Sequence, residues 1–409
     1  VLAIQGNCAS MDVLDQAGVR EADLLIVATS ADEINLLCSL TAHCMNKDIH
    51  TIARIRNPEY TNQLVRMRDA FALSMTVNPE LQAAVEIERL IKYPGFLKRD
   101  TFAKGRVEIV ELRVIKESPL CDLCLNDLEQ VVKCQVLVCT VLRRGEAVAP
   151  DGNFVLREGD RIFVTAPSEN LTILLKNLGI ITHKARRIMI CGGGRISYYL
   201  AKKLEKSGID VLIIEQNPDR CLELAAVLPD ACIIQGDASN ERVLSNEGIE
   251  DCDVLVTLTG LDEINMIVSL YGNSCGVPQI ITKLGRVESG RLLEQVSLGS
   301  VISPKELCCD SIIRYVRAMK NQTGAAVAVH AIADGQAEAL EFRVDRQTIH
   351  CGEPLKNLTL KKNILIVCIT HRGKFEIPNG ESSYEVGDRG IVVSNGDEVI
   401  YQLNDIFEA

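Results

Sequence analysis

Hydrophobic and polar positions form two distinct patterns along the chain. Between residues 188 and 282, short runs rich in Val and Ile are separated by helix-length segments with one apolar face. The runs that read as strands are Ile188–Cys191, Val211–Glu215, Ala231–Gln235, Val254–Thr257 and Gln279–Thr282. Apolar strands joined by helices predict a parallel sheet covered on both faces, in a Rossmann-like α/β fold.

A second pattern stands on either side of this region. Segments such as "VEIVELRV" (107–114), "VLVCTVLRRG" (136–145) and "DRIFVTA" (160–166) alternate over short lengths, with Gly-Asp and Asp-Gly turns between them. This alternation predicts a small α+β module with mostly antiparallel pairing.

Both patterns occur twice, because the chain contains an internal repeat. Residues 3–40 align without gaps with residues 233–270 at an offset of 230, and "DEIN" stands at 32–35 and again at 262–265. A second match relates Arg143–Val164 to His371–Val393, and we pair Pro119-Leu120 with Pro354-Leu355. The protein is therefore two copies of a two-part unit.

The repeat predicts four domains. Residues 1–98 form a partial Rossmann-like domain, 99–182 a small α+β domain, 183–320 a complete Rossmann-like domain, and 321–409 a second small domain. Boundaries are expected near Lys98–Gly105, Thr182–Arg187 and Lys320–Gly324, where polarity rises and the periodicity breaks.

The candidate chemistry centres on a glycine turn in the second copy. The turn and the start of its helix comprise Gly192, Gly193, Gly194, Arg195, Ile196 and Ser197. The first glycine permits the tight turn, and Gly194 lets the backbone approach a pyrophosphate at the helix N-terminus. Arg195 is placed to pair with phosphate oxygens. Ser197 stands where the usual fingerprint has its third glycine.

Glu215 ends the next strand and indicates which nucleotide fits. A carboxylate at this place accepts hydrogen bonds from a ribose diol and disfavours a 2′-phosphate. The pattern therefore predicts NAD, ADP or ATP rather than NADP. The alternative is an α/β turn that binds nothing.

Other polar residues end the strands that follow, and we expect them at the same edge of the sheet. In the second copy they are Asp237, Thr259, Gly260 and Lys283, and their first-copy counterparts include Thr29, Ser30 and Arg54. Helix capping explains Asp32 and Asp262 better than ligand binding does. Arg54 and Lys283 fit solvated surface charges equally well.

The glycine turn has no twin in this sequence. Gly192 precedes Gly236 by 44 residues, and Gly6 is the counterpart of Gly236, so a twin would lie near position −38. We expect the opening β-α-β of the first copy to be missing, by truncation or by disorder. The first site would then lack its phosphate loop.

Composition and charge argue against several classes of protein. The net charge of −11 and 4% aromatic content argue against nucleic-acid binding. No apolar run is long enough to span a bilayer, and the first residues do not read as a signal peptide, so we expect a soluble protein.

The 16 cysteines lie mostly in apolar surroundings, which indicates a reducing compartment. Cys121 and Cys124 form one CxxC pair, which fits half a zinc site, a redox pair or an apolar strand-to-turn pattern.

Several motifs together resemble the TrkA family of Trk-type potassium-uptake regulatory subunits, which are RCK (regulator of potassium conductance) proteins. They are the doubled "QGD/N" and "TxxDEIN", the segment "IARIRNPEY" (52–60), and a "GExxxPxGxxxLxxGD" pattern in the small modules. The resemblance covers essentially the whole chain. The missing first glycine loop and Ser197 depart from the family pattern.

The resemblance implies a cytoplasmic homo-oligomer, peripheral to the inner face of the membrane, that controls a membrane potassium transporter of the TrkH/KtrB type. It also implies that NAD(H), or else ADP or ATP, is the ligand, and that the small modules are RCK C-terminal subdomains. The site residues carried over are Gly192, Gly193, Gly194, Arg195, Ile196, Glu215, Asp237, Thr259, Gly260 and Lys283, with Thr29, Ser30 and Arg54 in the truncated first site.

Two other functions remain open at this stage. An NAD-dependent oxidoreductase needs a positioned acid or base, but the six His residues are scattered and none recurs in both copies. A nucleotide-free scaffold would use the sheets for oligomerisation alone. The complete glycine turn favours a regulator over either alternative, so we expect no catalytic and no metal-ligating residues.

Overall fold

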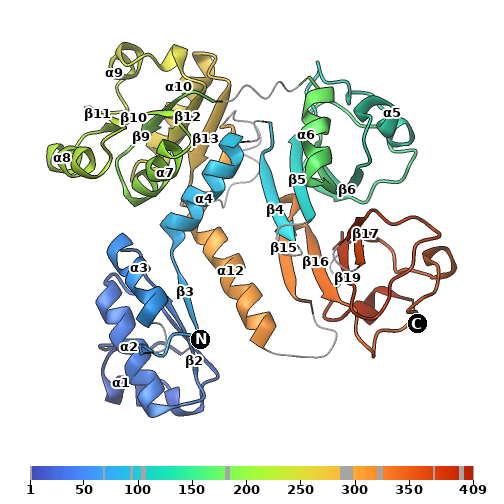
Figure 1. The fold of residues 1–409 in the computed structure, drawn as a ribbon, viewed down its shortest axis with the longest axis horizontal. Coiled ribbons are helices and arrows are strands. Elements are labelled where there is room, and N and C mark those ends of the chain that lie inside the picture. The colour runs from blue at the N-terminus through green and yellow to red at the C-terminus, as the bar shows by residue number, and fades with distance from the viewer. Residues whose placement is uncertain are drawn as a thin grey trace.

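The computed structural model follows the chain through two parallel and two antiparallel sheets (Figure 1). It describes residues 2–67, 70–92, 95–102, 107–179, 185–285, 298–319, 326–371, 374–395 and 400–408. Each parallel sheet is followed along the chain by a smaller antiparallel one. The predicted fold class, Rossmann-like domains each followed by a small α+β module, is confirmed.

The second copy contains a complete six-stranded parallel sheet. Its strands are β9 (Arg187–Cys191), β10 (Asp210–Glu215), β11 (Cys232–Gln235), β12 (Val254–Thr257), β13 (Gln279–Lys283) and β14 (Ser300–Ile302). They lie in the order β11-β10-β9-β12-β13-β14. The order reverses between β9 and β12, and ligands bind beyond the carboxyl ends of such a switch point. The short β14 was not predicted.

Helices connect β9 to β13 along the chain. They are α7 (Arg195–Glu205), α8 (Pro218–Val227), α9 (Glu241–Asn246) and α10 (Asp262–Ser274), and α12 (Pro304–Met319) follows β14. Local sequence explains where α8 begins. The Asn217 side chain accepts hydrogen bonds from the backbone of Asp219 and Arg220, and Pro218 occupies the first turn.

The first copy has a three-stranded sheet, β1-β2-β3, which corresponds to β12-β13-β14. Its elements are α1 (Met11–Gln16), β1 (Leu24–Val27), α2 (Asp32–Met45), β2 (His50–Arg54), α3 (Pro58–Met67), β3 (Met75–Val77) and α4 (Pro79–Lys92). In the described residues no strand pairs with the outer edge of β1. Ile26 is consequently 47% exposed, whereas its counterpart Val256 is fully buried.

The two copies exchange their last helices. Helix α4 leaves the first sheet and packs on the second copy, where Ile87 and Leu90 join one apolar core with Ile188, Ile190 and Leu200 (Figure 1). At the end of α4, Gln279 of β13 donates a hydrogen bond to the Leu90 carbonyl at 2.8 Å. Each copy therefore depends on the other for the burial of its sheet.

Helix α12 crosses in the opposite direction. Its residues Cys308, Ile312 and Tyr315 pack against Ile52 of β2 and Val77 of β3. The Tyr315 hydroxyl also lies 2.7 Å from Nδ1 of His50. This face of α12 is thus buried against the other copy.

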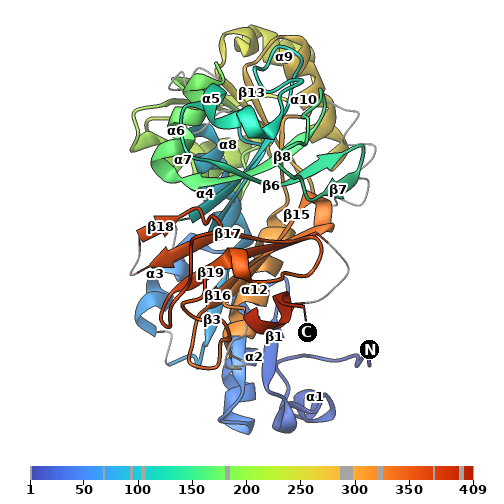
Figure 2. The same ribbon diagram turned by 90° about the vertical axis from the view of Figure 1, so that its right-hand side faces the viewer.

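The two small modules have the same five-stranded antiparallel topology. The first has β4 (Lys98–Phe102), β5 (Val107–Arg113), α5 (Leu128–Val132), β6 (Leu137–Arg143), β7 (Glu146–Val148), β8 (Arg161–Pro167) and α6 (Ser168–Asn177). The second has β15 (Ala328–Ile332), β16 (Ala337–Arg343), β17 (Ile364–His371), β18 (Lys374–Glu376) and β19 (Arg389–Ser394). The sheets are stacked on each other (Figure 2), and we call the apolar surface between them, centred on Phe102, Ile109, Phe163, Ala339 and Ile391, the seam.

One detail of the sequence-based alignment is wrong. The pairing of Pro119-Leu120 with Pro354-Leu355 fails, because Leu125 donates to Phe154 as Leu355 donates to Ser382, so Leu125 is the counterpart of Leu355. The offset of 230 residues thus continues into the small modules as far as Leu125, and it is 228 where Phe154 corresponds to Ser382. Strand β4, the first strand of the first small module, begins in the polar segment at Lys98–Gly105 where a domain boundary is expected. Polar side chains of β4 form ion pairs, Lys98 with Asp100 and Arg99 with Glu108.

No helix in the described part of the chain has the length and apolar character needed to cross a membrane.

The exchange of α4 predicts that a first-copy mutation weakens the second copy. Replacing the fully buried Ile87 by Ala should lower the free energy of unfolding by about 2–5 kcal/mol, through lost burial and a cavity. Amide hydrogen exchange should accelerate in β9, which belongs to the other copy. The exposed Ile115 replaced by Ala is the control. Faster exchange confined to first-copy strands would contradict the shared core.

Candidate functional site

A cavity of about 840 Å³ opens at the carboxyl ends of β9 to β13, at the switch point of the second sheet. All the second-copy candidates line it: Gly192, Gly193, Gly194, Arg195, Ile196, Glu215, Asp237, Thr259, Gly260 and Lys283. The order of strands alone brings these side chains and backbone segments to one edge.

The glycine turn has the shape expected of a phosphate loop. Gly192 has a φ of +104°, and a Cβ atom there would lie 2.8 Å from the Leu258 carbonyl oxygen. A Cβ atom at Gly193 would lie 2.6 Å from the Leu224 side chain. Gly194, in contrast, faces open space, because nothing lies within 4 Å of its Cβ position. The first two glycines are thus required by packing, and the third keeps the cavity open.

Ser197 fits its position without a third glycine. Its side chain is completely buried, and Oγ donates a hydrogen bond to the Gly192 carbonyl at 2.5 Å. This bond ties the first turn of α7 to the end of β9. The departure from the glycine fingerprint therefore leaves the turn intact.

Glu215 holds the glycine turn from the neighbouring strand. Its carboxylate accepts hydrogen bonds from the Gly193 amide at 2.6 Å and the Asn217 amide at 2.8 Å. A carboxylate has about four acceptor positions, so ribose hydroxyls can still bind to it. Across the turn, Nε of Arg220 donates to the Gly193 carbonyl at 2.8 Å, which is a support that the sequence did not suggest.

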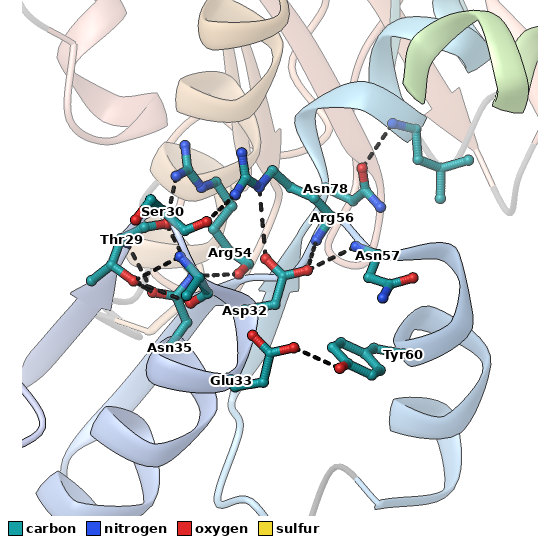
Figure 3. Close-up of polar contacts among 12 residues, drawn as sticks. Thr29, Ser30, Asp32, Glu33, Asn35, Arg54, Arg56, Asn57, Tyr60 and Asn78 are labelled. Atoms are coloured by element: carbon teal, nitrogen blue, oxygen red, sulfur yellow. Dashed lines mark hydrogen bonds and ion pairs between the residues drawn. The ribbon is translucent and has the colours of Figure 1, made fainter. Parts of the chain in front are cut away.

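The repeated Thr and Asn of "TxxDEIN" fix the edge of both sheets. Asn265 accepts hydrogen bonds from the amide and the hydroxyl of Thr259, both at 2.8 Å, and donates to the Lys283 carbonyl at 3.0 Å. Asn35 makes the same three bonds to Thr29 and Arg54 (Figure 3). These buried amides lock the loop after one strand to the end of the next.

The prediction that Asp32 and Asp262 cap helices is wrong. Asp32 is the first residue of α2, and no side chain caps that helix. Its carboxylate instead accepts hydrogen bonds from the amides of Arg56 and Asn57, at 2.8 and 2.7 Å, in the loop after β2 (Figure 3). Asp262 likewise accepts from the Gly285 amide, at 2.8 and 2.9 Å. Both carboxylates hold the loop of the adjacent strand.

Arg54 lines the second-copy cavity, although it was expected in a separate first-copy site. Its guanidinium is half-buried and donates to the Thr29 carbonyl at 2.6 Å, so it is not a solvated surface charge. Thr29 and Ser30 do not line this cavity. The first copy contributes to the wall because α4 crosses to the second sheet.

The wall opposite the glycine turn is rich in charge. Burial lowers the pKa of Lys283, against the opposing influence of Asp262 and Glu80, and its Nζ donates to the Thr259 carbonyl. Nε of Arg54 and Oε2 of Glu80 are buried, and neither has a hydrogen-bond partner among the described residues. Both residues line the cavity.

Glu80 and Lys305 were missed by sequence reasoning, although a repeated signal was present. Val77-Asn78-Pro79-Glu80 and Ile302-Ser303-Pro304-Lys305 both join a short strand to a helix that begins with Pro. Both prolines and both charged residues line the cavity. The first turns of the exchanged helices α4 and α12 therefore flank it, with opposite charges at equivalent positions.

The CxxC pair is not part of this cavity. Sγ of Cys124 donates to the Gly152 carbonyl at 3.2 Å, within the first small module. Among the described residues, no three His, Cys, Asp or Glu side chains gather as metal ligands would.

Comparison with known proteins identifies the domain types. The TrkA-N domain model matches residues 1–77 and again 188–304, and the TrkA-C domain model matches residues 109–179. The double match agrees with the internal repeat. The fold and cavity thus define a protein with tandem TrkA-N domains.

Full-length relatives narrow the assignment. The Trk system potassium uptake protein TrkA homolog of Archaeoglobus fulgidus is 32% identical over 407 residues, covering 100% of this chain and 90% of the relative. The TrkA protein of Halomonas elongata is 30% identical, covering 95% of this chain and 83% of its own length. The chain belongs to the TrkA family of Trk system potassium uptake proteins.

Solved structures share the fold at lower identity. The GsuK RCK domain has a TM-score of 0.58 at 18% identity, covering 96% of this chain and 82% of that one. The GsuK channel bound to NAD also has a TM-score of 0.58 at 18% identity, covering 96% of this chain and 68% of that one. These likenesses establish the RCK-type fold.

The geometry of the turn predicts different responses from two glycines. Gly192→Ala should lower the Tm by several degrees, because a Cβ atom would clash with the Leu258 carbonyl at a positive φ. Gly194→Ala should change the Tm by less than about 2 °C, because its φ is −68° and the space is open. Thermal unfolding by circular dichroism measures both. Equal losses would show that the turn is built differently.

Proposed function

We propose that this protein is a nucleotide-binding regulatory subunit of a potassium transport system, with its ligand in the second-copy cavity. Membership of the TrkA family supports the link to potassium uptake. The ligand is an adenine nucleotide, with NAD(H) as the first choice and ADP or ATP as the others. The four predicted domains, 1–98, 99–182, 183–320 and 321–409, are the working units of this proposal.

One observation carries the assignment of a nucleotide. The open side of Gly194, the N-terminus of α7 and the Glu215 carboxylate face one cavity at the switch point of a parallel sheet. A helix N-terminus with exposed amides favours phosphate oxygens, and an acidic residue at the end of the second strand favours a ribose diol. The exposed Arg195 would add a positive charge beside the phosphates.

The size and charge of the cavity support a dinucleotide or a nucleotide with several phosphates. About 840 Å³ falls in the upper part of the usual range of roughly 300–1,000 Å³ for ligand sites. Lys283, Lys305 and Arg54 add positive charge on the wall away from the glycine turn. NAD occupies the GsuK channel, a protein of similar fold.

Regulation would follow from the shared wall. A ligand that contacts the glycine turn of the second copy and Arg54 or Glu80 of the first has unequal affinity for arrangements that place these groups differently. Such unequal affinity is the requirement for a ligand to shift a conformational equilibrium. A membrane potassium-transport subunit of the TrkH/KtrB type would receive the change, with this protein bound as a homo-oligomer at the cytoplasmic face.

An oxidoreductase is the weaker candidate. No His of the described residues lines the cavity, so the usual acid or base beside a nicotinamide ring has no candidate of that type there. The relatives are named as potassium uptake proteins. A nucleotide-free scaffold would need no open turn at Gly194.

Ligand binding is tested by calorimetry and thermal shift with NADH, ADP and ATP. At least one should bind and raise the Tm by a few degrees at a concentration of about 100 times its Kd. Gly194→Leu should abolish binding by filling the open side of the turn. Lys206→Leu, which adds the same side chain at the exposed far end of α7, is the matched control. Absence of binding by all three nucleotides would overturn the proposal.

The buried Lys283 makes the proposed binding pH-dependent. Burial lowers its pKa, whereas bound phosphates favour the protonated form, so affinity should fall as pH rises through the Lys283 pKa. Calorimetry between about pH 7 and pH 10 should show this decline in the native protein and a weaker, flatter profile in Lys283→Met. Parallel profiles would exclude a contact between Lys283 and the ligand.

A further inference from the structure

The seam between the small modules contains one pair of buried ionisable residues at equivalent positions of the repeat. Asp100 lies on β4 opposite Ile109 of β5, and His330 lies on β15 opposite Ala339 of β16. Asp100 and His330 are 230 residues apart, as are Ile109 and Ala339, so they occupy equivalent positions of the repeat. Nδ1 of His330 lies 3.0 Å from Oδ1 of Asp100, so each residue contacts its own counterpart in the other copy.

The pair is enclosed within the seam. His330 is 4% exposed and Asp100 is 8% exposed. The His330 ring packs edge-on against Phe102, with ring centroids 4.6 Å apart. Lys98 lies 3.8 Å from the second Asp100 oxygen and donates to the Ala331 carbonyl at 3.0 Å. A charge in this place is therefore partly removed from water, and its partner matters.

Contact between equivalent positions has a consequence for pairing. If two identical modules formed the same seam, the residue at this position would face itself. Two copies of the first module would place Asp100 against Asp100, and like charges about 3 Å apart disfavour ionisation of both. Only the pairing of a first module with a second module joins a carboxylate to an imidazole. This contact is favourable whether the ring is neutral or charged.

A second polar contact crosses the seam. Gln336 donates to the Gly145 carbonyl at 2.6 Å and accepts from the Ala147 amide at 3.0 Å. The side chain of the second module thus binds the turn between β6 and β7 of the first. The contact adds two hydrogen bonds between the modules to a largely apolar surface.

We propose that the Asp100–His330 pair selects the partner of each small module, favouring the other module of the same chain over the like module of a second chain. It is sufficient that the pair disfavours contact between two first modules. If two second modules paired with each other, the two first modules of the same chains would have only each other left as partners. Specificity is a difference between affinities, and an unfavourable alternative contributes to it as much as a favourable contact does. The inference does not depend on the proposed nucleotide binding.

Exchange of the two residues tests whether the pair is reciprocal. In the full-length protein, His330→Asp and Asp100→His should each lower the Tm by several degrees, because each places like residues together. The double variant Asp100→His/His330→Asp restores the pair in the opposite sense and should recover most of that loss. Lys356→Glu, which disrupts the exposed pair with Glu381, is the control and should shift the Tm by less than about 2 °C. Additive losses in the double variant would overturn the proposal.

A cross-linking experiment tests the choice of partner. Unlabelled and ¹⁵N-labelled chains are unfolded, mixed, refolded and treated with a short lysine–lysine cross-linker. Like pairing of first modules brings two Lys98 residues together, whereas the native seam places Lys98 beside the second module, which has Ala328 at that position. Mixed-isotope Lys98–Lys98 peptides should be rare in the native protein.

Asp100→Asn provides a variant that should fold, because it keeps the size of the side chain and its acceptor oxygen. It removes the like-charge repulsion between first modules, so the mixed-isotope peptide should rise several-fold. In the double variant Asp100→His/His330→Asp, the yield of the mixed-isotope peptide should return toward its native level. This variant again places a carboxylate beside an imidazole within one chain. An unchanged peptide yield in Asp100→Asn and in His330→Asp would show that the pair stabilises the seam without selecting its partner, and the proposal would be wrong.

Discussion

The exchange of α4 and α12 is the constraint on which the other features depend. A parallel sheet needs apolar cover on both faces, and here each copy receives part of that cover from the other. Ile87 and Leu90 complete the core of the second copy, while Cys308 and Ile312 pack against the first. Because these helices cross, their first turns reach the cavity edge, and Arg54, Glu80 and Lys305 become part of one site.

The repeat preserves the scaffold and differentiates its surfaces. Asn35 and Asn265 make the same hydrogen bonds in both copies, and Asp32 and Asp262 hold equivalent loops. At two equivalent places, however, the copies carry complementary residues: Glu80 and Lys305 at the cavity, and Asp100 and His330 at the seam. Ile26 and Val256 are both apolar and differ in exposure, because they lie in sheets of different completeness. Duplication supplies the symmetry, and these differences distinguish the two copies.

The sequence predicted what local periodicity and repetition determine. The strands of the second sheet, the glycine turn and the antiparallel modules follow from apolar runs, turn residues and the offset of 230. It could not predict which sheet α4 covers, since an amphipathic face states only that the helix is buried. Arg54 was therefore expected only beside Thr29, whereas it also lines the second-copy cavity. Asp32 resembled a helix cap because its true partners, the amides of Arg56 and Asn57, become neighbours only when β2 lies beside β1.

The crossing helices also govern the order in which the chain can fold. The first sheet ends at Val77, yet the helix that covers it begins at Pro304. During synthesis, Ile52 and Val77 emerge long before Cys308 and Ile312 exist to bury them. Contacts this distant in sequence form late and leave apolar surface exposed in the interval. A ribosome that makes this protein thus carries an unfinished sheet until about three quarters of these 409 residues have been synthesised.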